Sequence, residues 1–177
     1  SFNLNGGSIK DNIGNNANLS LARFTTNIAH LSNQWKEIQE LSADNLDTND
    51  YFGSSVAIDG NYAIIGADGF NGNNNSAYIF KKDNNSDSWS EQYKLISSDA
   101  DTNYQLGYSV SIYISTYKDY AIVGSVAQNS FSGAAYIFER DYALESWSEI
   151  QKLTSSDGGA FGSSVYINRE YAFVGAQ

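Results

Sequence analysis

Short apolar segments, in which polar residues often stand at alternate positions, recur along the chain between clusters of Gly, Asn, Asp and Ser. Alternation with a period of two is typical of β-strands with one packed face, and the polar clusters are typical of turns. The alternation is clearest at Val56 and Ile58 and again at Tyr78 and Phe80. In one stretch of the chain the pattern predicts four strands: Gly53–Ile58, Tyr62–Gly66, Ala77–Lys81 and Trp89–Ile96.

This stretch is repeated. Trp35, Trp89 and Trp147 each begin a similar run that ends in Leu, and an acidic turn follows each run. Two further segments then recur in three copies: Phe52-Gly-Ser-Ser-Val56, Leu106-Gly-Tyr-Ser-Val110 and Phe161-Gly-Ser-Ser-Val165, followed by Tyr62-Ala-Ile-Ile-Gly66, Tyr120-Ala-Ile-Val-Gly124 and Tyr171-Ala-Phe-Val-Gly175. The second copy is longer because of extra residues around 115–118, and an insertion confined to one connection indicates an exposed hairpin turn.

Each repeat therefore reads as four short antiparallel strands, which is the content of a propeller blade. Asp59-Gly60 between the first two strands predicts a two-residue hairpin, because that turn needs a residue with positive φ. We predict an all-β fold of β-propeller-type blades, each a four-stranded antiparallel sheet, with about three repeats. The expected division is an N-terminal segment 1–34 with a degenerate half-blade strand, repeat 1 at 35–88, repeat 2 at 89–146 and a partial repeat 3 at 147–177.

The repeats resemble the FG-GAP repeats of integrin α-subunit headpieces and of many bacterial and eukaryotic surface proteins. The residues that carry the resemblance are Phe52-Gly53 with Gly66-Ala67, Phe161-Gly162 with Gly175-Ala176 and, more weakly, Leu106-Gly107 with Gly124-Ser125. The resemblance covers roughly Trp35 to Gln177 and rests on repetition. It implies a propeller fold, an extracellular or cell-surface location, and a structural or adhesive role through protein contacts.

The two ends of the chain predict an assembly. The last repeat stops after its second strand, and Leu19–Phe24 resembles a degenerate third strand. Exposed strand edges attract other strands, so we expect another copy to complete the sheet by strand addition, head to tail, as a ring or a filament. The alternative, a piece of a longer propeller, predicts the same ends. The segments Tyr62–Gly66, Tyr120–Gly124 and Tyr171–Gly175 are expected to be the buried second strands of three related sheets.

Composition narrows the possible functions. Hydrophobic residues make up 41% and charged residues 17%, which excludes a disordered chain, and the apolar segments are too short for membrane insertion. A net charge of −10 without a basic patch argues against nucleic acid as a partner. The absence of cysteine excludes disulfides, thiol catalysis and thiolate metal sites.

No catalytic constellation is visible, and we expect the protein not to be an enzyme. His30 is the only histidine and has no repeated counterpart, so neither a nucleophile–base pair nor a histidine metal cluster can be built around it. The serines after each Phe-Gly or Leu-Gly recur in every copy, which indicates a structural role for them and not a catalytic one. The three tryptophans are expected to pack between neighbouring blades, the alternative being an exposed platform that stacks on sugars.

One candidate metal site and three candidate glycosylation sites remain. Asp99, Asp101 and Asn103 are alternating oxygen side chains; a solvated turn is the default explanation for them, and the alternative is a site for Ca²⁺, while no other cofactor is expected. A second acidic turn carries Asp44, Asp47 and Asp50. The glycosylation acceptors by sequence are Asn18, Asn74 and Asn84.

The leading hypothesis is an extracellular structural or adhesive repeat module whose partners are proteins, above all other copies of itself. Two alternatives stay open. One is a carbohydrate-binding propeller that uses Tyr and Trp between blades to hold glycans. The other is a non-catalytic fragment of a larger surface protein or enzyme, because propellers also occur within enzymes.

Overall fold

The computed structural model describes residues 19–25, 34–44, 46, 49–69, 75–99, 105–127 and 132–177. Within these ranges the secondary structure is entirely β, and every strand pair is antiparallel, as the repeat pattern predicts. No helix in the described part of the chain has the length and apolar character needed to cross a bilayer.

Two four-stranded sheets form the centre of the molecule, and each has its strands in chain order. Blade 1 consists of β3 (Phe52–Asp59), β4 (Tyr62–Ala67), β5 (Ser76–Lys82) and β6 (Trp89–Leu95). Blade 2 consists of β7 (Leu106–Tyr113), β8 (Tyr120–Ser125), β9 (Ala134–Asp141) and β10 (Ser146–Leu153). These are the blades of a propeller-type fold, and each ends with the strand that contains the next tryptophan.

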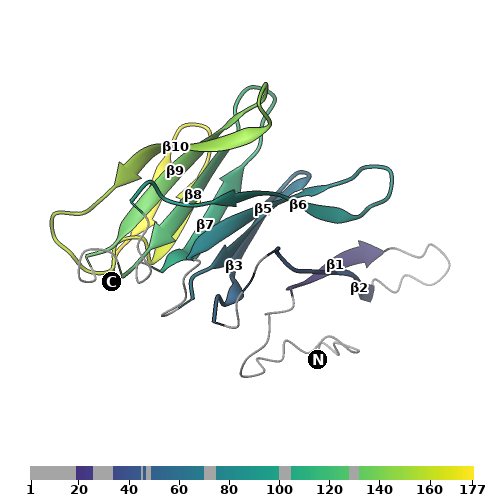
Figure 1. Ribbon diagram of the computed structural model, residues 1–177, viewed down its shortest axis with the longest axis horizontal. Coiled ribbons are helices and arrows are strands. Elements are labelled where there is room, and N and C mark those ends of the chain that lie inside the picture. The colour runs from purple at the N-terminus through teal and green to yellow at the C-terminus, as the bar shows by residue number, and fades with distance from the viewer. Residues whose placement is uncertain are drawn as a thin grey trace.

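A two-stranded sheet lies on each side of the blades. The N-terminal half-blade consists of β1 (Leu19–Thr25) and β2 (Gln34–Leu41). The C-terminal half-blade consists of β11 (Ser164–Ile167) and β12 (Ala172–Gly175). Figure 1 shows the sheets side by side in the order of the chain, from the purple half-blade to the yellow one.

The hairpin between β3 and β4 forms as the sequence predicts. Asp59 pairs with Tyr62, and Gly60 adopts a φ of +56°, which a side chain would make unfavourable. The connection between β7 and β8 is longer and contains the inserted residues, so blade 2 differs from blade 1 at this end.

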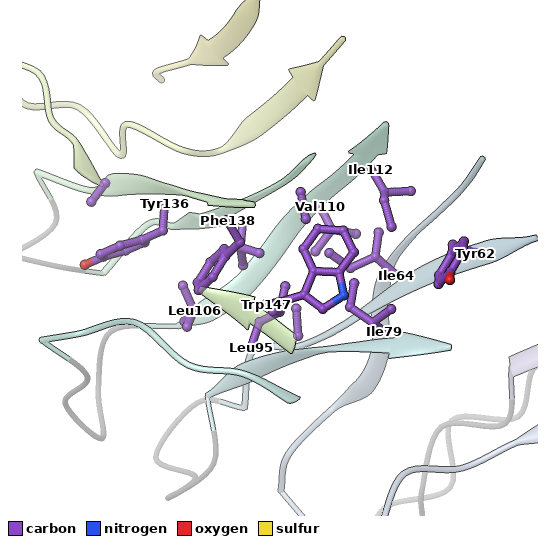
Figure 2. Close-up of a cluster of buried hydrophobic side chains, with 14 residues drawn as sticks. Tyr62, Ile64, Ile79, Leu95, Leu106, Val110, Ile112, Tyr136, Phe138 and Trp147 are labelled. Atoms are coloured by element: carbon purple, nitrogen blue, oxygen red, sulfur yellow. The ribbon is translucent and has the colours of Figure 1, made fainter. Parts of the chain in front are cut away.

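The core lies between the blades. Trp147 is buried among Ile64, Ile79 and Leu95 of blade 1 and Val110 of blade 2 (Figure 2). Trp89 belongs to a second cluster, which joins blade 1 to Leu41 of the N-terminal half-blade. The prediction that the tryptophans pack between blades is confirmed for these two. The side chain of Trp35 lies outside the described residues.

The expectation of three buried second strands is wrong for the third. Strands β4 and β8 are almost completely buried because a sheet packs on each of their faces. In β12, by contrast, Ala172 and Phe173 are exposed, and Val174 and Gly175 are half-buried. The physical reason is that, in the described structure, the C-terminal half-blade packs on blade 2 with one face only. The same apolar sequence is therefore buried or exposed according to its neighbours.

Candidate functional site

A serine–glycine hydrogen bond joins successive blades at the same place in each repeat. The Ser55 hydroxyl of blade 1 donates to the Gly107 carbonyl of blade 2 over 2.7 Å. The Ser109 hydroxyl of blade 2 donates to the Gly162 carbonyl beside β11, also over 2.7 Å. The recurring serines and the recurring Phe-Gly or Leu-Gly pairs are thus two halves of one inter-blade contact.

Glycine on the second strand is needed for this contact. A Cβ atom on Gly66 would lie 2.0 Å from the Gly107 carbonyl oxygen, and one on Gly124 would lie 2.1 Å from the Gly162 carbonyl oxygen. Gly107 and Gly162 also have φ of +101° and +95°, a region that side chains rarely adopt. The recurring glycines at these positions are therefore structural.

A carboxylate contact recurs in the same way. Glu91 of β6 accepts a hydrogen bond from the backbone N–H of Asp44, which follows the N-terminal half-blade, over 2.9 Å. Glu149 of β10 accepts one from the N–H of Ser98, which follows blade 1, over 2.7 Å, and a second from the Ser98 hydroxyl over 3.0 Å. Each blade therefore anchors the turn that leaves the preceding one.

The N-terminal half-blade has the geometry of the third and fourth strands of a blade. Leu19 pairs with Leu41 as Ala77 pairs with Leu95, and a register irregularity follows Leu21 in β1, just as one follows Ile79 in β5. The Gln39 side chain also ties this half-blade to blade 1, because its amide donates to the Trp89 carbonyl and accepts from the Trp89 N–H, both over 2.8 Å.

The C-terminal half-blade has the geometry of the first and second strands. Its exposed face carries three aromatic rings in contact, Tyr166, Tyr171 and Phe173, which are 54%, 61% and 61% exposed. Tyr62 and Ile64 hold the positions of Tyr171 and Phe173 in blade 1, where blade 2 buries them. The aromatic face of the C-terminal half-blade is therefore equivalent to the face of blade 1 that packs against blade 2.

A matching apolar surface lies on blade 1. Val56 and Ile58 of β3 are 52% and 59% exposed. Val110 and Ile112, which hold the same positions in β7, are buried against blade 1. Exposed apolar groups of this size, next to each other on one strand, are typical of an interaction surface.

A polar cluster stands at the outer rim of blade 2. The buried Arg140 guanidinium donates to the buried Asp119 carboxylate over 3.1 Å and to Glu145. It lies over the rings of Tyr62 and Tyr142, with 4.9 and 5.1 Å to their centroids. These contacts fix the insertion between β7 and β8 to the next hairpin.

The cluster shifts two pKa values. Burial and the hydrogen bond of its hydroxyl to Asp119, over 2.9 Å, raise the pKa of Tyr142 to about 12. Burial alone would lower the pKa of Arg140, but its hydrogen bonds to Glu145 and Asp119 outweigh this and raise it. Arg140 therefore stays charged and Tyr142 stays a hydrogen-bond donor across the physiological range.

Next to this cluster the surface has a hollow of about 280 Å³. Its lining includes Tyr117, Lys118, Glu139, Asp141, Ser148 and Ile150. The insertion contributes the first two, and strands β9 and β10 contribute the others. Sequence spacing marks the insertion, but nothing in the sequence shows that Asp119 turns inward to meet Arg140.

The proposed calcium ligands are described only in part. Asp101 and Asn103 lie outside the described residues, and Asp99 is bound by the Tyr136 hydroxyl over 2.8 Å and the Lys152 ammonium over 2.7 Å. Although partial burial opposes it, these two bonds hold the pKa of Asp99 below its usual value. The described residues contain no group of three His, Cys, Asp or Glu arranged for a metal.

Of the other candidates, Asn84 is exposed in the β5–β6 turn, where its side-chain oxygen accepts from the Asn61 amide over 2.8 Å. Asn18, Asn74 and His30 lie outside the described residues, as does Asp47 of the second acidic turn. Calcium binding and glycosylation at these positions stay predictions.

Comparison with known proteins agrees with the repeat geometry. No curated protein matches the chain. A family model described as FG-GAP repeat matches residues 35–80 and 89–138, which together make up more than half of the chain. Such repeats form propeller-type protein–protein interaction modules and are typical of extracellular or surface proteins. The chain belongs to the FG-GAP repeat family.

Proposed function

We propose that this protein is an extracellular adhesive or structural module without catalytic activity, and that it assembles with copies of itself head to tail by strand addition. One observation carries the proposal: the two half-blades are complementary. Strands β11 and β12 correspond to the first two strands of a blade, and β1 and β2 correspond to the last two. A β1–β2 pair from one copy and a β11–β12 pair from another would make one four-stranded blade.

Among the described strands β12 pairs with β11 alone, so its other edge can accept a strand. The carbonyls of Tyr171 and Gly175 face β11, where they accept from Asn168 and Gly162 over 2.9 Å. Because peptide groups alternate along a strand, those of Ala172 and Val174 face the opposite edge. The equivalent peptide groups of β4 pair with β5 in blade 1, and β1 is the strand that corresponds to β5.

We call the contact between β12 of one copy and β1 of the next, with the blade faces on either side of it, the joint. The register of blade 1 predicts which residues pair across this joint. In that sheet Ala63 is opposite Phe80 and Ile65 is opposite Tyr78. Transfer of this register to β12 of one copy and β1 of the next gives Tyr171 with Arg23, Ala172 with Ala22, Phe173 with Leu21, Val174 with Ser20 and Gly175 with Leu19.

The surfaces on either side of the joint are also complementary. Blade 1 of the incoming copy keeps its contact with its own β1–β2, so it would cover the aromatic face of the C-terminal half-blade. Val56 and Ile58 would then pack where Val110 and Ile112 pack in the chain itself. The Ser164 hydroxyl would donate to the Gly53 carbonyl, and Gly53 has a φ of +95°, like its counterparts Gly107 and Gly162. Donor and acceptor surfaces differ, so the contact is head to tail.

Light scattering on the intact chain tests the proposal. We expect masses at multiples of the monomer. Val174→Pro removes an N–H that faces the free edge without removing a bond to β11, and Val56→Asp places a charge in the joint. Both variants should be monomeric with unchanged β-sheet circular dichroism, and the control Val174→Ile should assemble. A wild-type chain that stays monomeric at all concentrations refutes the assembly. Surface labelling of intact source cells tests the extracellular location separately.

A further inference from the structure

The feature that carries a further inference is the insertion that distinguishes blade 2 from blade 1. In blade 1, Gly60 and Asn61 alone connect β3 to β4. In blade 2 the connection runs from Ile114 to Asp119 and lies beside residues of β9 and β10. Ile114, its first residue, packs against the core between the blades and donates its N–H to the Asp59 carboxylate of blade 1 over 2.8 Å, but residues 115–118 take no part in that core.

The inserted loop is held firmly. The Ser115 hydroxyl donates to the Lys118 carbonyl over 2.8 Å and accepts from the N–H groups of Tyr117 and Lys118 over 3.2 and 3.0 Å. The Ser115 N–H donates to the buried Asp119 carboxylate over 2.9 Å. From the neighbouring hairpin, the Tyr142 hydroxyl donates to the Ser115 carbonyl over 3.0 Å. The loop is therefore preorganised and loses little conformational entropy when a ligand binds.

The rigid loop presents an aromatic ring to solvent. Tyr117 is 78% exposed and lines the hollow of about 280 Å³ at the rim. Tyrosine rings held by ordered loops are frequent in recognition sites, because they offer a large contact area at a low cost in conformational entropy. The ring lies beside polar groups, so the ligand must combine an apolar face with hydroxyl or amide groups.

The charges around the hollow favour a neutral ligand. Lys118 and Arg140 are balanced by Glu139 and Asp141, and Lys118 is paired with Glu139 while Arg140 is held by Asp119. Glu139 and Asp141 each have a second carboxylate oxygen besides the one that takes Lys118 or the Ala143 N–H. These oxygens, with the Ser148 hydroxyl, suit a ligand with several hydroxyl groups.

We propose that the hollow binds one neutral pyranose ring of a saccharide. The apolar face of the sugar stacks on Tyr117, and its hydroxyls donate to Glu139 and Asp141 and exchange hydrogen bonds with Ser148. The volume lies just below the range of about 300–1,000 Å³ that is usual for drug-sized ligands, which suits a single ring. The buried Trp89 and Trp147 take no part, so the site differs from a stacking platform of tryptophans between blades.

The test uses the intact chain and four probes, the methyl glycosides of glucose, galactose, mannose and N-acetylglucosamine. Saturation-transfer NMR should show binding of at least one, and amide shifts in the protein should cluster at 117–118, 139–142 and 148. Tyr117→Ala should weaken binding at least tenfold, and Asp141→Asn should weaken it too. Tyr51→Ala is the matched control, because Tyr51 is also exposed but lies before β3, at the opposite end of a blade.

Two outcomes would overturn the proposal. One is the absence of saturation transfer from all four glycosides at millimolar concentration. The other is binding that Tyr117→Ala leaves unchanged, which would place the sugar elsewhere. Tyr117→Ala and Asp141→Asn alter exposed side chains, so both variants should keep the wild-type melting temperature. Assembly should persist in Tyr117→Ala, which separates this site from the joint between copies.

Discussion

Replacement of Gly66 by alanine is the sharpest probe of how the blades meet. The new Cβ would lie 2.0 Å from the Gly107 carbonyl oxygen and 2.3 Å from the Ser55 hydroxyl oxygen. Gly66 is not among the residues with positive φ, so the backbone itself tolerates alanine. The cost therefore comes from these two contacts, and the one with the Gly107 backbone lies between blade 1 and blade 2.

Two effects determine how much Gly66→Ala lowers the free energy of unfolding. The carbonyl is a backbone atom, so the blades must separate locally, and overpacking of this kind costs about 1–3 kcal/mol. Their separation also weakens the hydrogen bond from Ser55 to Gly107, which is worth about 0.5–1.5 kcal/mol. We expect Gly66→Ala to lower the free energy of unfolding by about 2–4 kcal/mol.

Urea denaturation followed by the fluorescence of the buried tryptophans measures this change. Gly124→Ala repeats the perturbation one blade further on, with 2.1 Å between its Cβ and the Gly162 carbonyl oxygen. Gly175→Ala is the matched control, because the three atoms nearest to its Cβ belong to the side chains of Ser163 and Ser164, which can rotate, and not to the backbone of a neighbouring blade. Equal losses for Gly66→Ala and Gly175→Ala, or a loss below about 0.5 kcal/mol for Gly66→Ala, would refute the reasoning.

Three further predictions concern the core and two titrating groups. Ile64→Ala should cost about 2–5 kcal/mol in a urea melt, because Ile64 is fully buried; a loss near zero would contradict the blade core. The raised pKa of Tyr142, about 12, means that its contribution to stability is complete below about pH 10 and is lost as the pH rises towards 12. Tyr142→Phe should therefore lose less stability than wild type between those values, and equal losses would contradict the assignment. Because the pKa of Asp99 is lower in the folded protein, Asp99 stabilises the fold above about pH 4, and this stabilisation is lost as the pH falls through the folded-state pKa. Asp99→Asn should therefore lose less stability than wild type on acidification, as recorded by circular dichroism.

Much of the fold could be predicted because the copies of the repeat can be aligned with one another, so that each copy supports the strand assignment of the others. Alternation at Val56 and Ile58 predicts a strand, and the recurrence of Ser55 and Ser109 after Phe-Gly and Leu-Gly predicts a structural role, which the hydrogen bonds to Gly107 and Gly162 explain. Local pattern is sufficient here because strand period and turn chemistry depend on neighbours in sequence.

The exposure of the last strand and the polar cluster of Arg140 and Asp119 could not be predicted in this way. The run Tyr171-Ala-Phe-Val-Gly175 reads like its two buried counterparts, and only the arrangement of sheets leaves it exposed. The partners Arg140 and Asp119 are far apart in sequence, and blade 1 has Lys82 in place of Arg140 and Asn61 in place of Asp119. A repeat pattern carries no signal for an interaction that occurs in a single repeat.

The most direct measurement of the central claim is a disulfide across the joint between two copies. The chain has no cysteine, so single cysteines introduced as Tyr171→Cys and Arg23→Cys react without competition. In the predicted register these residues are opposite each other as a non-hydrogen-bonded pair, with about 4.5 Å between Cα atoms, a distance that a disulfide can bridge. We predict a disulfide-linked dimer when the two variants are mixed and oxidised, and little when Tyr171→Cys is mixed with Phe24→Cys, because position 24 is one residue along β1 and the period of two assigns it to the other face of the sheet. Equal yields from the two mixtures, or no dimer in either, would contradict it.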